Sequence, residues 1–593
     1  MSSNTDPSFT DTTDFAATSR GFIAALTPPV IKSASGKTVW DIDAYSFLQD
    51  ECPETAHPNL WRQGQLTAKH GLYEICPGIY HIRGYDLSNM TIVEGKDGII
   101  IIDPLISCEC AAAGLKLYRE HRGPRKVRGM VYSHSHGDHY MGAAGVLDLD
   151  EGEEPGIPII ALEGFMEAIM SESILAGPAM RKRGAFMYGN ALPRSPTGQI
   201  GTGLGLGSSV GTTSLIPPTL LIQKTGEEHV VDGVRIVFQM VPGSEAPIRR
   251  SISISLTSKI SVRDAKAWSG YLDEAIVLFG RDSDVLFGSH HWPTWGRDEL
   301  IARLAEQRDL YGYMHDQTVR LMNLGLTGVE IAERMRLPGR IERKWHCRGI
   351  TGGIYQKYMT WFDGRPEHLW QYPPTEEGQR YVECFNGIDG LCDKAEAFVQ
   401  KRDYRSAATL LAHAVAADSG STEPRPKLLL ASVYEQLGFG AENATWRNFY
   451  LTGAQELRSG KKAGMVAGGR TPLGERLSID QWFDIMAVQL DGERGADMHF
   501  TIDWEITDVK QRWRLIVSNG VLTTRSLNTE IQVQEARENP ADYEMVLTKS
   551  QLLEVILGQE VKPERKSGRE EVLGQLLDLI SVQDGSSRGP SQL

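Results

Sequence analysis

The sequence predicts an α/β sandwich in its N-terminal half, followed by an all-α region and then by a smaller α+β domain. From about residue 70, short apolar segments separated by Gly-containing turns alternate with amphipathic segments, which is typical of α/β folds. Residues 376–458 instead contain apolar side chains at i, i+3 and i+4, the spacing of helices with one buried face. After residue 476 apolar and polar residues alternate, as in antiparallel strands with one exposed face.

The N-terminal elements can be placed in order along the chain. Residues 75–84, 90–95 and 98–104 predict short strands, and the third contains the apolar run Ile99–Ile102 of a strand buried on both faces. Residues 108–123 predict a helix, and residues 126–139 predict a strand that leads into a polar, histidine-rich loop. A second β-rich region covers 229–241 and 274–293. Between them, GTGLGLGSSVG at 201–211 fits no dinucleotide-binding pattern and predicts a flexible Gly-rich loop.

Changes in composition divide the chain into five parts. The polar segment 1–36 predicts a flexible N-terminal tail, and 37–372 form the first folded domain. The turn PPTEE opens a helical domain over 373–458, and the Gly- and Lys-rich segment 459–475 predicts a linker. Residues 476–593 then form the α+β domain. In that domain the apolar side chains that share one strand face are covered by the amphipathic helix at 570–580; they are Phe500, Ile502, Trp504 and Ile506.

The composition excludes several classes of protein. The 593-residue chain carries a net charge of −14, which argues against a general nucleic-acid-binding protein. It contains no run of about 18 apolar residues, so no membrane span is predicted. The N-terminus lacks a secretory pattern and the seven cysteines are few and scattered, which together predict a cytoplasmic protein. The final Ser591-Gln592-Leu593 resembles the peroxisomal S-K-L signal with Gln in place of the basic residue, so the peroxisome is the alternative.

The loop after the strand at 126–131 carries a dense group of metal-ligand side chains. Histidine is rare in this chain, with 15 residues in 593, yet three fall within six positions. Burying these groups without a cation would cost on the order of 1–3 kcal/mol each. In an extended loop His134 and His136 point the same way and can bind one ion, whereas Asp138 and His139 lie beyond Gly137 and can face a second. Imidazole and carboxylate ligands favour zinc, with manganese or iron as alternatives.

Two further ligand candidates follow predicted strands downstream. Glu245 lies in PGSEAP, after the strand predicted within 229–241. His290 and His291 lie in HHWP, after the second β-rich segment. Either His290 or His291 can be the ligand at this point, since the residues alone do not separate them.

The motifs GYDLSNMTIVEG, YSHSHGDHYMG, PGSEAP, SHHWPTWG and WRNFYLTGAQELR together resemble the alkyl sulfatases of the metallo-β-lactamase superfamily. The resemblance covers residues 65–590. It implies an αββα sandwich, a helical dimerisation domain, and a C-terminal domain similar to sterol carrier protein 2 that binds alkyl chains. It also implies a homodimer that hydrolyses long-chain alkyl sulfate esters such as dodecyl sulfate. Two zinc ions would be bound, one by His134, His136 and Glu245 and the other by Asp138, His139 and His291.

The chain departs from this family pattern after PGSEAP. The family has a longer segment there, which contains a second Glu that bridges the metals and a cluster around the sulfate. Here the segment Ile248–Ser261 contains no Asp, Glu, His or Asn. Either the gene model has omitted coding sequence, or the chain is a variant with impaired or altered chemistry.

Three functions therefore compete on sequence grounds. The first is a zinc-dependent alkyl sulfatase, impaired by the missing segment. The second is a hydrolase of the same fold that acts on a thioester or lactone, since such chemistry requires the metals but no sulfate cluster. The third is a non-enzymatic protein that binds amphiphiles through its C-terminal domain. The sequence assigns no residue as general acid or base, and it does not distinguish C–O from S–O cleavage.

Overall fold

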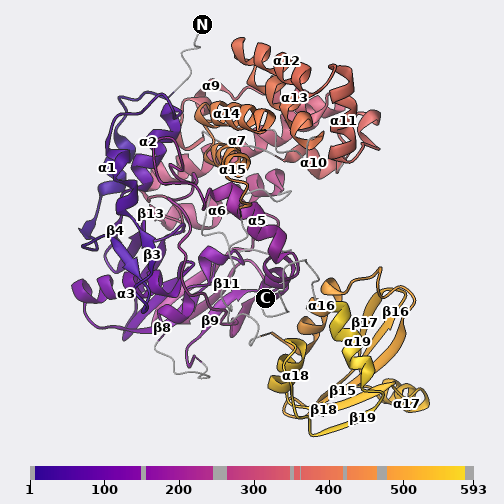
Figure 1. Cartoon of the computed structure of the whole chain (residues 1–593). Helices are drawn as coiled ribbons and strands as arrows, with labels where there is room; N and C mark the ends of the chain where they lie inside the picture. Colours follow the sequence, from indigo (N-terminus) through magenta and orange to yellow (C-terminus); the bar gives the residue numbers. More distant parts are fainter. Residues whose placement is uncertain are drawn as a thin grey trace. The chain divides into compact units, whose positions relative to one another are not determined.

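The computed structural model describes residues 7–147, 155–244, 264–347, 353–360, 362–417, 424–463 and 477–580, which belong to two units. Unit 1 comprises residues 1–169 and 179–465, and unit 2 comprises residues 170–178 and 466–593. The predicted order of an α/β region, a helical region and an α+β domain is confirmed (Figure 1). None of the helices in the described ranges combines the length and apolar character needed to cross a bilayer.

Unit 1 is built on an eight-stranded sheet of order β1-β4-β5-β6-β7-β8-β9-β10. The neighbours from β1 to β7 pair antiparallel, and those from β7 to β10 pair parallel. The strands are β1 (Phe22–Ala24), β4 (Gly71–Cys76), β5 (Ile79–Arg83), β6 (Met90–Glu94), β7 (Gly98–Ile102), β8 (Lys126–Val131), β9 (Ile159–Leu162) and β10 (Leu220–Ile222). The three strands predicted within 75–104 and the strand predicted at 126–131 all belong to this sheet.

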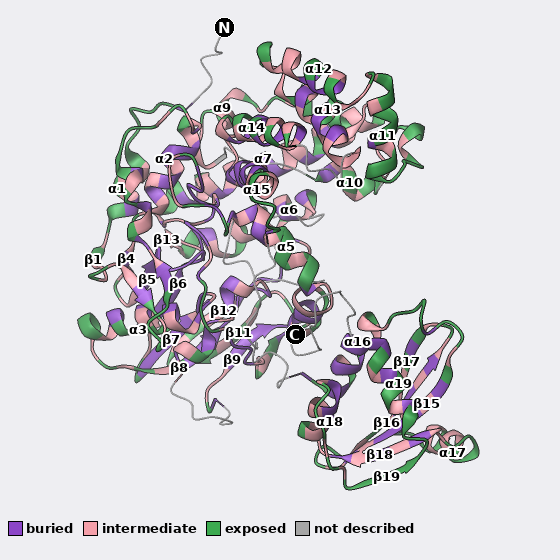
Figure 2. Ribbon diagram, viewed as in Figure 1, coloured by how far each residue is buried: buried purple, intermediate pink, exposed green. Residues whose placement is uncertain are grey.

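One face of the sheet is covered by the hairpin β11 (Glu227–Val231) and β12 (Val234–Phe238). Val231 and Phe238 of the hairpin pack in one buried cluster with sheet residues such as Ile100 and Ile160. The predicted helix at 108–123 is α3 (Cys108–Arg122), and its Gly114 lies against Ile82 and Met90 of the sheet. Figure 2 shows the buried residues of unit 1 gathered along these strands.

The segment 7–36 is folded, which corrects the predicted flexible tail. It contains α1 (Thr13–Ser19), β1, and β2 (Val30–Lys32), which pairs with β3 (Thr38–Asp41). Phe22 packs edge to face on Tyr73, and Asp14 forms an ion pair with the buried Arg62 of α2 (Pro58–Thr67). These contacts offset the entropy of ordering a segment whose composition alone is typical of mobile chain.

The apolar run within 274–293 was also predicted wrongly as strand. Residues Ala265–Phe279 form α6, whose N-terminus is capped by the side chain of Asp264. A short apolar run does not distinguish a strand from one side of a helix, and here helix packing decides. Only β13 (Val285–Leu286), paired with β14 (Thr294–Trp295), remains as strand in this region.

The rest of unit 1 is mainly helical, which confirms the helices predicted within 376–458. After α4 (Phe165–Ile169), α5 (Gly177–Tyr188) and the loops of the sandwich come the long helix α7 (Arg297–Asn323) and a succession of shorter helices. These are α8 (Gly328–Arg334), α9 (Gly339–Glu342), α10 (Ile354–Met359), α11 (Pro374–Cys384), α12 (Ile388–Gln400), α13 (Tyr404–Ala417), α14 (Arg425–Phe439) and α15 (Ala444–Ser459).

Unit 2 contains a five-stranded sheet of order β17-β16-β15-β18-β19, in which β15 and β18 pair parallel. The predicted apolar face is confirmed: the side chains of Phe500, Ile502, Trp504 and Ile506 are all buried. A bidentate ion pair between Asp503 and Arg514, with N–O distances of 2.7 and 2.8 Å, lies buried on neighbouring strands. The elements are α16 (Ile479–Gln489), β15 (His499–Ile506), β16 (Gln511–Ser518), β17 (Val521–Ser526), α17 (Glu530–Glu538), β18 (Tyr543–Leu547), α18 (Lys549–Ile556), β19 (Arg565–Gly568) and α19 (Glu571–Ile580).

Candidate metal centre

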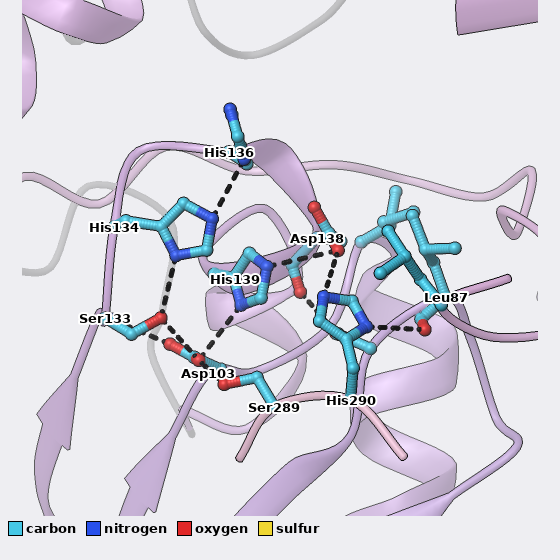
Figure 3. A network of polar contacts seen from close by, with 12 residues as sticks. Leu87, Asp103, Ser133, His134, His136, Asp138, His139, Ser289 and His290 are labelled. Atoms are coloured by element: carbon cyan, nitrogen blue, oxygen red, sulfur yellow. Dashed lines mark hydrogen bonds and ion pairs between the residues drawn. The ribbon is translucent and has the colours of Figure 1, made fainter. Parts of the chain in front are cut away.

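The polar site of unit 1 is formed by loops that follow β7, β8 and β13. Because β7 and β8 are parallel neighbours, their C-terminal ends lie side by side, the edge at which α/β folds place their ligands. Asp103 follows β7 directly, and its backbone N–H donates to the carbonyl of Val131 at the end of β8. The histidine loop continues from β8, and Ser289 and His290 follow β13 closely. Figure 3 shows the side chains from the three loops converging.

Asp103 is the buried anchor of this site. Its side chain is 1% exposed and its backbone has a positive φ of 56°, a conformation that Asp tolerates better than most residues. Its carboxylate accepts hydrogen bonds from the backbone N–H and the hydroxyl of Ser133, from the hydroxyl of Ser289, and from Nδ1 of His139 at 2.9 Å. Asp103 thus ties together the three loops and fixes the proton of His139 on Nδ1.

With Nδ1 so engaged, Nε2 of His139 is available as a ligand atom. It lies 3.1 Å from Oδ2 of Asp138, and Nε2 of His290 lies 3.5 Å from the same oxygen. The ligand atoms of Asp138, His139 and His290 lie within 4.8 Å of one another, and all three residues are buried. Nδ1 of His290 lies 3.2 Å from the carbonyl of Leu87, which leaves its Nε2 facing the group. The donor set and its spacing fit a metal ion of the zinc class.

The electrostatics of this group favour a cation. Burial alone would lower the pKa of His139, but the charges of Asp138 and Asp103 and their hydrogen bonds raise the pKa to about 10. Two carboxylates on either side of one imidazole therefore hold a positive charge there. The same two carboxylate charges would stabilise a bound divalent metal ion.

His134 and His136 lie beside this group. Nε2 of His134 is 2.9 Å from Nδ1 of His136, and Nδ1 of His134 is 3.0 Å from the hydroxyl of Ser133. The rings of His134 and His139 have centroids 4.0 Å apart. The structure thus brings together four of the six predicted metal ligands: His134, His136, Asp138 and His139. Glu245 lies outside the described residues.

The structure separates the two adjacent histidines that sequence reasoning could not distinguish. His290 belongs to the metal-ligand group, whereas His291 has a positive φ of 62° and its Nδ1 lies 3.1 Å from Nε2 of Gln63. Burial lowers the pKa of His291 to about 4. Its carbonyl accepts from the side chain of Asn89. His291 therefore faces a different environment from His290.

The glycine that the loop requires is Gly142 rather than Gly137. A Cβ at Gly142 would lie 2.1 Å from the carbonyl oxygen of Pro104, because the histidine loop presses against the Asp103 loop there. At Gly137 a Cβ would meet only the flexible side chain of Met141. The Asp103-Pro104 dipeptide after an apolar strand was a visible signal for this second loop. Ser289 and the carbonyl of Leu87 had no such signal, since their roles arise only from tertiary contacts.

Sequence profiles of three families match the chain. Residues 83–207 match the metallo-β-lactamase superfamily, residues 327–460 match alkyl sulfatase dimerisation, and residues 471–585 match the alkyl sulfatase C-terminal domain. A linear primary-alkylsulfatase from Pseudomonas sp. is 41% identical over 609 positions, which cover 97% of this chain and 89% of the relative. An alkyl/aryl-sulfatase from Saccharomyces cerevisiae is 38% identical, covering 87% of this chain and 83% of the relative.

A solved structure shows the same architecture across the chain. The stereoselective inverting sec-alkylsulfatase from Pseudomonas sp. superimposes with a TM-score of 0.90 at 37% identity, covering 98% of this chain and 96% of that chain. An (R)-specific secondary-alkylsulfatase from Pseudomonas sp. is 39% identical over 603 positions, covering 96% of this chain and 90% of the relative.

Proposed function

Because this chain belongs to the alkyl sulfatase family of the metallo-β-lactamase superfamily, we propose that it is a zinc-dependent hydrolase of long-chain alkyl sulfate esters such as dodecyl sulfate. The observation that carries the proposal is the buried group of Asp138, His139 and His290 at the C-terminal edge of the sheet, with His134 and His136 beside it. Relatives named as alkylsulfatases support the choice of ester.

We assign two zinc ions to this centre. The first would be bound by His134, His136 and Glu245, and the second by Asp138, His139 and His290. His290 replaces the predicted His291 in this assignment because its Nε2 lies against Asp138 and His291 is bonded to Gln63. Zinc bound there would lower the pKa of a coordinated water toward about 7 and polarise the ester.

The residues behind the ligands fix the protonation of the imidazoles. Asp103 holds the proton of His139 on Nδ1, and the carbonyl of Leu87 does the same for His290. The hydroxyl of Ser133 lies against Nδ1 of His134 and itself donates to Asp103. Each contact orients a ring so that its other nitrogen faces the centre, the arrangement that metal-binding histidines usually show.

The short segment after Glu245 supports slower hydrolysis of the sulfate ester than in the relatives. Ile248–Ser261 contains no Asp, Glu, His or Asn, and it lies outside the described residues. The alignment with the primary-alkylsulfatase spans 609 positions, more than the 593 residues of this chain, so the relative carries residues that have no counterpart here. We therefore propose that this chain is impaired in sulfate binding.

The test combines metal analysis with release of sulfate from dodecyl sulfate. The proposal predicts two zinc ions per chain, slow release of sulfate, and loss of tight binding at the first site in His136→Ala. Two zinc ions with turnover of a thioester or lactone but no sulfate release would favour the second hydrolase. Dodecyl sulfate binding without metal would favour a non-enzymatic amphiphile-binding protein.

The helical region supports a homodimer. Residues 327–460 match the dimerisation family, and two-fold pairing is the commonest symmetry of such assemblies. Light scattering should give a mass near twice 65.6 kDa at micromolar concentration. A mass near 65.6 kDa would contradict the dimer.

For unit 2 we propose a role in binding the alkyl chain. A buried CH₂ contributes about 0.8 kcal/mol, so dodecyl sulfate should gain several kcal/mol over hexyl sulfate even after ordering costs. Ending the chain in the segment 459–475 should therefore weaken binding of dodecyl sulfate much more than binding of hexyl sulfate. Equal weakening of both would limit unit 2 to a structural role.

Six of the seven cysteines are free thiols, which is typical of a reducing compartment such as the cytoplasm; they are Cys52, Cys76, Cys108, Cys110, Cys384 and Cys392. We propose the cytoplasm, with the peroxisome as the alternative because of the C-terminal tripeptide. Fluorescence microscopy of the tagged chain, with the tag at the N-terminus, distinguishes the two.

A further inference from the structure

A small pocket in unit 1, partly open to solvent and with about 20 Å³ of room for the centres of water-sized molecules, is lined in part by His291, the neighbour of His290. Its wall includes Arg83 at the end of β5, Thr18 of α1, Asn89, and the adjacent His291 and Trp292. The Gly-rich loop predicted at 201–211 closes it. Leu204 and Leu206 of that loop are buried in the wall, so the loop is packed rather than flexible there.

Arg83 is the unusual member of this wall. It is 3% exposed, its Nη1 donates to the carbonyl of Thr18 at 3.2 Å, and its guanidinium lies 3.4 Å from the centre of the Tyr73 ring. Its Nε and Nη2 are buried and find no hydrogen-bond acceptor among the described residues. Burial lowers the pKa of Arg83 to about 10, which leaves it charged at neutral pH. A buried cation with two free N–H groups requires an acceptor, because leaving it unpaired is costly.

The nearest carboxylate in the wall does not supply that acceptor. Asp86 accepts from the backbone N–H groups of Leu87, Ile106 and Ser209 and from the hydroxyl of Ser209. Among the described residues, Asp86 included, nothing accepts a hydrogen bond from Nε or Nη2 of Arg83. The carboxylate is thus already satisfied, and the free N–H groups of Arg83 remain.

His291 adds a second donor to the same wall. The side-chain N–H₂ of Gln63 donates to Nδ1 of His291, which places the ring proton on Nε2. His291, which also lines the pocket, therefore carries an N–H group on Nε2. Its neighbour His290 belongs to the metal-ligand group, so the pocket wall and that group each include one residue of the His290-His291 dipeptide.

We propose that this pocket binds a small inorganic anion on the free N–H groups of Arg83, and that the bound anion holds the His290-His291 dipeptide in place. A volume of about 20 Å³ for the centres of water-sized molecules holds little more than one water, which favours a small anion such as chloride over an ester with an alkyl chain. The proposal does not depend on which ester the metal centre hydrolyses.

Thermal unfolding of the purified full-length protein tests the proposal. Sodium chloride, sulfate and gluconate are compared at equal ionic strength, because screening alone affects all three alike. The expected result is a saturable rise in Tm with chloride or sulfate over gluconate, on the order of 1–2 °C when the anion is tenfold above its Kd, because the unfolding entropy of so large a unit keeps the shift small. A response to both anions identifies a site for small anions in general, and a response to sulfate alone identifies an oxyanion site. An equal response to all three salts would overturn the proposal.

Two arginine variants distinguish loss of anion binding from a general loss of stability. Arg83→Met retains the stem packed on Tyr73 but removes the N–H groups, so its Tm should lose the anion dependence. Arg447 is the matched control, since it is 1% exposed and its guanidinium nitrogens all donate to carbonyls of Thr55, Pro196, Gly198 and Gly438. Arg447→Met should lower Tm yet keep the response to anions.

Crystals of the unchanged protein give a test that does not require a folded variant. After a soak in bromide, anomalous scattering should show a peak within hydrogen-bonding reach of Nε or Nη2 of Arg83. Ordered water at this position and no bromide would overturn the proposal, because water alone would then satisfy the guanidinium.

Discussion

Replacing Asp103 by asparagine tests how far the residues behind the ligands control the metal centre. Asn has nearly the same shape and also tolerates the positive φ of 56°, so the backbone should stay in place. The four donors around the carboxylate stay as well: two from Ser133, one from Ser289 and one from His139. One side-chain oxygen becomes an N–H₂ group, and in either orientation that group faces at least one of these donors.

The expected magnitude follows from this mismatch. A buried donor left without an acceptor costs about 1–3 kcal/mol of folding free energy. Loss of the carboxylate behind a ligating histidine weakens metal binding about 10- to 100-fold, or about 1.4–2.7 kcal/mol. The second effect arises because His139 is no longer held with its proton on Nδ1 and its Nε2 toward Asp138.

Competition with a chromophoric chelator measures the zinc Kd directly, and Asp86→Asn is the matched control. Asp86 is also 1% exposed and also accepts four hydrogen bonds, but none comes from a side chain of the metal-ligand group. Only Asp103→Asn should raise the Kd about 10- to 100-fold, whereas Asp86→Asn should leave the Kd unchanged. Equal Kd values in the two variants would refute a special role for Asp103.

Three other predictions concern glycine packing, pH and unit 2. Gly142→Ala should lower Tm and weaken zinc binding, because its Cβ would lie 2.1 Å from the carbonyl oxygen of Pro104. Gly137→Ala should be tolerated, since its Cβ would meet only the side chain of Met141. Equal Tm values for the two variants would contradict this packing argument. Burial raises the pKa of the Asp86 carboxyl from 3.8 to about 6, so the folded state binds this proton more tightly than the unfolded state does. The free energy of unfolding of the unchanged protein should therefore fall by about 3 kcal/mol as pH rises from about 4 to 6, when it is compared with that of Asp86→Asn. A difference that stays constant across that range in chemical denaturation would exclude this titration. Arg514→Met should destabilise unit 2 by about 3–5 kcal/mol because it leaves the carboxylate of Asp503 buried and unpaired, and calorimetry that shows no change would indicate that water reaches the carboxylate.

The sequence predicts those parts of the site that depend on residue type and on local spacing. The strand that ends at Val131 and the loop that contains His134 and His139 are local features, so their pattern is sufficient. The choice between His290 and His291 depends instead on backbone conformation and on contacts with Gln63 and Leu87, which are more than 200 positions away in the chain. Periodicity carries no information about such contacts.

The two fold-level errors have the same physical origin. The segment 7–36 has a polar composition, yet pairing of β1 with β4 and the contact of Phe22 with Tyr73 order it. Residues 274–279 are apolar enough for a strand, yet they complete a helix that begins at Ala265. In both places tertiary packing overrides a local preference that was weak.

The path of the chain between the two units has a consequence for how they separate. Residues 170–178 belong to unit 2 although unit 1 precedes them at Ile169 and follows them at Ala179, and their turn Met170–Leu175 packs on α16. The backbone therefore crosses between the units three times rather than once. A protease that cuts only within 459–475 would leave two pieces, which the packing of Met170–Leu175 on α16 still joins without a covalent bond. A single cut should therefore not release residues 476–593 on gel filtration.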